Sequence, residues 1–254
     1  KEKPDWEKMH IRIKDMGGDT LFTYKVKADT GLQIVNWYLN EKGVRYPSRK
    51  KVKKDAKDPW GPGVAPGKYK LLIKYGSNED STEVEVRTDP RVKYDPAGDA
   101  ERRKLRSEFN KTVDLARNSM ERLLDMQETM KRAASQFVLA EDSIQKKIKK
   151  AGKKVNDSII KIQNLFMQAE GLTGYQDNSK KLNTYLYNAT GHIESVNGKP
   201  TSTTLNAVNF AKSETDKIVA QINDFVNTMW KEYQDEVAKY QMKLFDDYED
   251  LKRE

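Results

Sequence analysis

The side chains that most often carry chemistry at neutral pH are scarce in this sequence. It contains no cysteine, which rules out disulfides, thiolate metal sites and cysteine nucleophiles. The two histidines, His10 and His192, fall in an expected strand and an expected helix. A surface or packing role is favoured for each, since no Gly-x-Ser-x-Gly elbow accompanies them. We therefore expect no catalytic residue, no bound metal and no cofactor.

Phosphate-cradling loops and paired carboxylates are not predicted either. The glycine-rich segment 61–67 contains two prolines, which lack a backbone donor, and it leads into an expected strand rather than a helix. Acidic residues alternate with Lys and Arg along the expected helices, the pattern of solvent-exposed ion pairs. A carboxylate pair that cleaves glycosidic bonds is therefore disfavoured. A fragment of a glycoside hydrolase acting on polysaccharide remains as an alternative function.

One loop could instead contact a partner through its charge. The chain carries a formal net charge of +8, and the excess of positive residues is concentrated in its first part. The run comprises Lys50, Lys51, Lys53 and Lys54, directly after Arg49. Such a run could attract nucleic acid or an anionic surface. No aromatic residues interleave it, as they do in single-strand binders, so nucleic acid is disfavoured and a solvated loop is the simpler explanation.

The same loop contains one aromatic residue that is a candidate for a contact. Trp60 lies between a proline and a glycine, where its ring could face a protein or glycan ligand. The alternative is that the ring plugs the edge of a sheet. The candidate partner-binding residues are therefore Trp60, Lys50, Lys51, Lys53 and Lys54.

The first ninety residues are expected to form short antiparallel strands. Residues 10–13 and 21–26 alternate or are rich in β-formers, and a glycine turn precedes the second run. In 31–39 we expect Leu32 and Ile34 to face a core, with Trp37 as a further candidate and a bulge or twist reconciling the spacing. Residues 69–75 and 82–87 are expected to form a hairpin across 76–78. The pattern predicts an Ig- or fibronectin-like β-sandwich over residues 1–92.

The hydrophobic period changes after the prolines at 90 and 96, and helical spacing begins. One apolar stripe starts at Leu105, and a cleaner one runs from Ile144 to Ala169, with a reversal expected near 134–140. Gly171 and Gly174 are expected to close the second helix. A third helix follows over 182–196, and a fourth is capped by Thr201 or Ser202 and continues to Leu244. We predict an up-down bundle of about four helices over residues 98–254.

Several of these segments resemble a known family. The stretches 11–18 and 31–39, then 64–71 and 84–91, resemble the Ig-like module at the C-terminal end of bacterial sortilin-like proteins with BNR-repeat propellers. A helical bundle follows that module in the family, whose members are often labelled glycosyl hydrolases. The propeller itself has no counterpart here, so the hydrolase activity that the label implies cannot be carried to these residues. Tyr38 also departs from the family, which usually has Asp after the Trp.

The resemblance implies an accessory role. We expect a non-catalytic structural or partner-binding C-terminal module of a larger exported bacterial protein, periplasmic, secreted or on the cell surface. The upstream propeller of the same protein is the expected partner, with a protein or glycan ligand as a further possibility. No leader and no run of about 18 apolar residues occurs, so no membrane span is predicted. The absence of an initial Met predicts a mature form or an excised piece.

Overall fold

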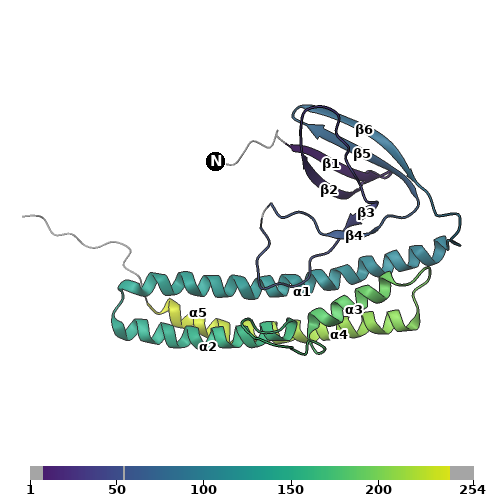
Figure 1. The fold of residues 1–254 in the computed structure, drawn as a ribbon. Coiled ribbons are helices and arrows are strands. Elements are labelled where there is room, and N and C mark those ends of the chain that lie inside the picture. Colours follow the sequence, from purple (N-terminus) through teal and green to yellow (C-terminus); the bar gives the residue numbers. More distant parts are fainter. Residues whose placement is uncertain (1–7, 54, 241–254) are drawn as a thin grey trace, which may run out of the picture. The chain divides into compact units, whose positions relative to one another are not determined.

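The computed structural model describes residues 8–53 and 55–240, and it has mixed α and β content (Figure 1). Two compact units make up the chain. The first comprises the described parts of 1–46, 50–115 and 186–212 and contains all the strands. The second comprises 47–49, 116–185 and the described part of 213–254. The predicted domains, 1–92 and 98–254, are continuous ranges, whereas each of these units is assembled from several segments of the chain. The predicted domain boundaries therefore stay a prediction.

A four-stranded antiparallel sheet with the order β2-β1-β5-β6 is the larger of the two sheets (Figure 1). The predicted strands at 10–13 and 21–26 are confirmed, and the predicted hairpin is β5 and β6, joined by a turn in which Gly76 has a φ of 59°. Only glycine adopts this left-handed conformation without strain. The strands of the larger sheet are β1 (Lys8–Asp15), β2 (Thr20–Lys27), β5 (Gly67–Tyr75) and β6 (Asn78–Val86).

The core of the first unit lies on one face of this sheet. Ile11 and Ile13 are fully buried, and because successive side chains of a strand alternate between faces, both point to the same side. Phe22, Val64 and Tyr69 complete the buried cluster. The antiparallel sheet predicted from the alternation is therefore present, although the finer assignment as a sandwich is not shown.

Segment 31–39 differs from its prediction. Leu32 and Ile34 were expected in the core, but they are 98% and 83% exposed. Trp37 does pack against the core cluster, as expected, and Val35 packs there in place of the two aliphatic residues. The segment keeps the two-residue alternation of an extended chain, yet its register is shifted by one, and such a shift exchanges the two faces. No bulge is needed, and the segment pairs with no strand among the described residues.

A second, two-stranded sheet pairs β3 (Asn40–Lys42) with β4 (Trp60–Gly63). Backbones approach closely around it. A Cβ on Gly43 would lie 2.4 Å from the Trp60 carbonyl oxygen, and a Cβ on Gly61 would lie 2.7 Å from the Glu41 carbonyl oxygen. Contacts below 3.0 Å with backbone atoms are not tolerated, so these two positions require glycine.

Four helical segments follow among the described residues, as predicted, because η2 directly continues α1 and because α4, η3 and α5 follow one another without a break. The predicted reversal near 134–140 is confirmed, because α1 ends at Gln136 and α2 begins at Asp142. Thr201 caps α4 as expected, since its hydroxyl accepts a hydrogen bond from the Thr204 backbone N–H at 3.2 Å. The elements are α1 (Pro96–Gln136), η2 (Phe137–Leu139), α2 (Asp142–Phe166), α3 (Leu182–Glu194), α4 (Ser202–Phe225), η3 (Val226–Trp230, a π-helical turn) and α5 (Lys231–Ala238).

The predicted apolar stripes are largely buried. In the second unit Met120, Leu123, Val155, Ile159 and Phe166 have at most 2% exposure. Two details of the helical prediction are wrong: α2 ends at Phe166, before Gly171 and Gly174, and Leu205 is 43% exposed rather than part of the seam. Leu244 lies outside the described residues. No helix in the described part of the chain is both long and apolar enough to cross a membrane.

Candidate binding site

Trp60 begins strand β4, and its side chain is 65% exposed. Its ring lies 5.0 Å from that of Tyr38, at an interplanar angle of 37°. Tyr38 is itself 65% exposed, so the two rings form an aromatic pair that is open to solvent. Large exposed aromatic groups of this kind are commoner at binding surfaces than elsewhere on a protein.

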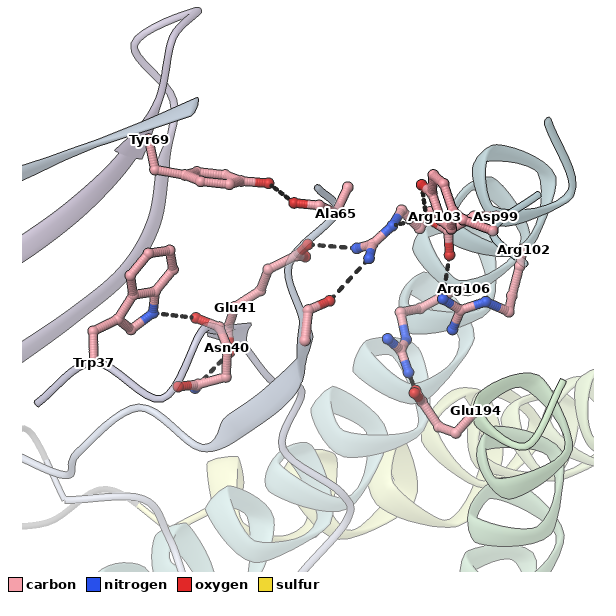
Figure 2. A network of polar contacts seen from close by, with 12 residues as sticks. Trp37, Asn40, Glu41, Ala65, Tyr69, Asp99, Arg102, Arg103, Arg106 and Glu194 are labelled. Atoms are coloured by element: carbon pink, nitrogen blue, oxygen red, sulfur yellow. Dashed lines mark hydrogen bonds and ion pairs between the residues drawn. The ribbon is translucent and has the colours of Figure 1, made fainter. Parts of the chain in front are cut away.

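The backbone between Tyr38 and Asn40 positions this pair. Leu39 has a φ of 56°, a left-handed conformation that is rare for a residue other than glycine. The carbonyl oxygen of Leu39 accepts a hydrogen bond of 2.7 Å from the Val64 N–H. The indole N–H of Trp37 donates to the Asn40 carbonyl oxygen at 3.0 Å (Figure 2). These bonds fix the turn that leaves Tyr38 on the outside.

Segment 31–38 carries a second exposed apolar feature, the side chains of Leu32 and Ile34. The segment is fastened on its inner side, because the Tyr24 hydroxyl donates to the Asn36 carbonyl oxygen at 2.9 Å. The ring of Trp37 also packs edge-on against that of Tyr69, with centroids 5.5 Å apart. The two aliphatic side chains are therefore held outward by an anchored backbone. We call Leu32 and Ile34 the apolar segment.

An ionic network connects α1 with the β3–β4 region inside the first unit (Figure 2). Arg103 donates to Asp99 at 2.8 Å, to Glu41 at 2.8 Å and to the Gly63 carbonyl oxygen at 3.0 Å. Arg102 forms a further ion pair with Asp99. One guanidinium group thus bridges a helix and both strands of the small sheet, and this cross-link positions Trp60 relative to α1.

Burial and charge shift the pKa values of two groups beside this network. Burial favours the neutral form of Asp99, but hydrogen bonds from Arg103 and Arg102 outweigh it and hold the pKa of Asp99 below its ordinary value. Burial, together with the nearby positive charge of Arg102, lowers the pKa of Arg106 to about 10. Arg106 therefore stays cationic at neutral pH, and it pairs with Glu194 (Figure 2).

A groove of about 340 Å³ lies between Trp60 and the helices α1 and α3, inside the first unit. Tyr46 and Thr190 share a hydrogen bond of 2.7 Å between their hydroxyl groups at its edge, and Tyr46 stacks on Tyr187 at 4.0 Å. Its lining also includes Arg106, Asn110 and Glu194. The groove thus combines an exposed indole ring with hydroxyl, amide and ionic groups, and this combination suits a polar ligand.

The predicted lysine run is exposed but is not part of this groove. Lys50, Lys51 and Lys53 are exposed, and Lys54 lies outside the described residues. The described lysine that lines the groove is Lys42, which pairs with Asp58 at 2.9 Å. The structure therefore does not bring Trp60 and the described residues of the lysine run together in one site.

Arg49, which precedes the run, is a structural residue of the second unit. Its guanidinium donates to the side chains of Gln163 and Asn164 at 3.1 and 2.7 Å, and to the carbonyl oxygen of Gln168 at 3.1 Å. Three bonds to polar groups at the end of α2 explain its partial burial. The guanidinium of Arg49 therefore binds groups of the protein itself, and we do not include it among the ligand-binding residues.

The two histidines occupy unrelated places. His10 lies on β1, opposite Lys25 of β2 and Lys74 of β5, and His192 is exposed in the last turn of α3. Across residues 8–53 and 55–240, no three side chains of His, Asp or Glu gather in a way that could hold a metal ion.

Sequence reasoning found Trp60 but missed the residues around it. Arg103, Glu41 and Asp99 are ordinary charged residues in the sequence, and nothing in their spacing connects positions 41, 63 and 103. The close backbone approach at Gly43 and Gly61 gave no signal either, because nothing in the sequence sets these two glycines apart from the others of the loop. Comparison with known proteins found no matching family model, no similar curated protein and no similar solved structure.

Proposed function

We propose that this chain is a non-catalytic module that binds a partner and belongs to a larger exported protein. The observation that carries the proposal is the apolar segment, in which Leu32 and Ile34 are 98% and 83% exposed on an anchored backbone. The proposed partner is an upstream β-propeller of the same protein, which follows from the family resemblance.

The energetics of the apolar segment favour contact with another protein surface. Burying one Leu or Ile side chain contributes about 1.5–3 kcal/mol, so covering both would contribute about 3–6 kcal/mol before other costs. The hydrogen bond from Tyr24 and the packing of Trp37 already order the backbone. The entropy lost on binding is therefore reduced, as in other preorganised contacts.

We further propose that the two sheets belong to an Ig-like sandwich. Antiparallel pairing in both sheets and the Greek-key-like return of β5 to lie beside β1 support this assignment. Trp60 is included in the proposed contact residues, and Lys50, Lys51, Lys53 and Lys54, which do not share its groove, are proposed as a second set. The lysines would act mainly through screened charge, so they should matter chiefly at low salt.

Hydrogen exchange of the isolated chain and of the longer protein that contains it tests the docking proposal. Amides of 31–38 should exchange at least about tenfold more slowly in the longer protein. The β5–β6 turn at 76–77 serves as the internal control and should be unchanged. Replacing Leu32 and Ile34 together with serine should abolish the difference, and equal exchange of 31–38 in both proteins would refute docking.

The non-catalytic part of the proposal has a separate test. The isolated chain should show no turnover of aryl glycosides, because we assign it no general acid or base. Reproducible turnover that disappears on changing one carboxylate would establish the alternative, a glycoside hydrolase fragment. A nanomolar complex with nucleic acid that weakens steeply with salt would instead favour the lysine run as the functional site.

A further inference from the structure

The groove beside Trp60 contains a polar group whose hydrogen-bonding capacity is unused. Asn110 lies in the groove wall, and its amide makes no side-chain hydrogen bond within the part of the chain that the structure describes. The Nη1 atom of Arg106 is buried and also lacks a partner there. Because this nitrogen has almost no exposed surface, it does not face the groove, and the unused hydrogen-bonding group that the groove offers is the half-buried amide of Asn110.

The charges of the groove are already balanced. Arg106 pairs with Glu194, and Lys42 pairs with Asp58. A phosphate or carboxylate ligand would have to compete with an existing carboxylate for either cation. The groove therefore favours a ligand without net charge that offers both donors and acceptors.

Trp60 supplies the groove with an aromatic ring on which a sugar ring could pack. Trp60 is 65% exposed and belongs to the groove lining, and its ring lies 5.0 Å from that of Tyr38. The C–H face of a pyranose ring packs well on an aromatic face, while its hydroxyl groups bond to amides and guanidinium groups at the edge. The volume of about 340 Å³ lies at the lower end of the range for small-molecule sites, which suits one or two sugar residues.

We propose that this groove binds a neutral saccharide, one or two pyranose residues of a glycan chain. Trp60 stacks on the sugar ring, and the Asn110 amide binds its hydroxyl groups, with the Tyr46–Thr190 hydroxyl pair at the edge. The proposal rests on the binding role proposed above but uses a different surface from the apolar segment. Because the groove is shallow and one ring provides the stacking, dissociation constants in about the millimolar range are expected.

The test uses neutral oligosaccharides of glucose, xylose, galactose, mannose and N-acetylglucosamine, with calorimetry and NMR of the tryptophan indole signals. At least one series should bind and shift the Trp60 indole signal, which is assigned by its loss in Trp60→Phe. Trp60→Ala and Asn110→Ala should each weaken binding by about tenfold or more. The matched control is Tyr175→Ala, since Tyr175 is 94% exposed and lies outside the groove.

Circular dichroism shows whether the variants are folded, and Trp60→Phe retains a stacking ring if Trp60→Ala does not fold. Leu32→Ser should leave saccharide binding intact, so loss of docking and loss of sugar binding are separable. The proposal is overturned if no neutral oligosaccharide binds, or if binding is unaffected by both groove variants. Binding restricted to acidic glycans, with a steep dependence on salt, would also overturn it and would assign the lysines instead.

Discussion

Replacing Arg103 with methionine should destabilise the first unit and loosen the β3–β4 region. The substitution removes the guanidinium but keeps an unbranched apolar stem of similar reach. It deletes hydrogen bonds to Asp99, Glu41 and the Gly63 carbonyl oxygen. Asp99 retains its ion pair with Arg102, whereas Glu41 is left without this partner.

The expected loss of unfolding free energy follows from the burial of these groups. Hydrogen bonds to charged groups contribute about 1.5–3 kcal/mol each when buried. The side chains of Arg103 and Glu41 are 23% and 31% exposed, so solvent screening reduces their pair towards the value of a surface ion pair. The total for Arg103→Met is therefore about 2–4 kcal/mol.

Urea unfolding monitored by tryptophan fluorescence measures the loss of unfolding free energy. Faster hydrogen exchange of residues 40–43 and 60–64 would show that the destabilised region is the small sheet. Lys104→Met is the matched control, because Lys104 is the next residue of α1 and is exposed; it should change stability by less than about 0.5 kcal/mol. A double-mutant cycle with Glu41→Gln isolates the bridging pair. If Arg103→Met were no more destabilising than Lys104→Met, the network would not hold the small sheet to α1.

Three further perturbations test other parts of the structure. Ile159→Ala should cost about 2–5 kcal/mol, because Ile159 is fully buried, whereas Ile160→Ala at a 37% exposed neighbour should cost much less; similar losses in thermal or urea unfolding would contradict the register of α2. Gly98→Ala should destabilise by about 1–3 kcal/mol, since its Cβ would lie 2.4 Å from the Lys199 backbone nitrogen, while Gly191→Ala meets no atom within 4 Å and should stabilise α3 slightly; equal effects would refute the close approach at Gly98. The lowered pKa of Asp99 means that its charged form contributes stability above the ordinary pKa of 3.8, and this contribution is lost as the pH falls through the lower pKa of the folded state. Asp99→Asn should flatten the acid limb of a stability–pH curve below 3.8, and an unchanged curve would contradict the assignment.

The regular elements of this protein could be predicted because their patterns are local. The β5–β6 hairpin follows from two β-rich runs around a glycine turn, and the seam containing Val155 and Ile159 follows from alternating spacings of three and four. Helix ends were less predictable, since α2 ends at Phe166 although the next glycine is Gly171. Side-chain periodicity determines which face is buried but not where the last turn ends.

The register of 31–39 could not be predicted because both faces of the segment carry apolar residues. Leu32 and Ile34 alternate with Val35 and Trp37, and hydrophobicity alone cannot choose between the two sets. The anchored turn at Leu39 and the edge contact of Trp37 with Tyr69 determine the choice. Both are tertiary features, and so are the contacts from Arg103 to residues 41 and 63.

The apolar segment, Leu32 and Ile34, is proposed to dock against another part of a larger protein. Photo-crosslinking tests it directly: a benzophenone amino acid is placed at position 34 of the longer protein, with position 79 on the exposed strand β6 as the control. We predict crosslinks from position 34 to a defined segment of the upstream propeller and none from position 79. An open reading frame that encodes no upstream domain, or crosslinks that do not distinguish the two positions, would contradict the claim.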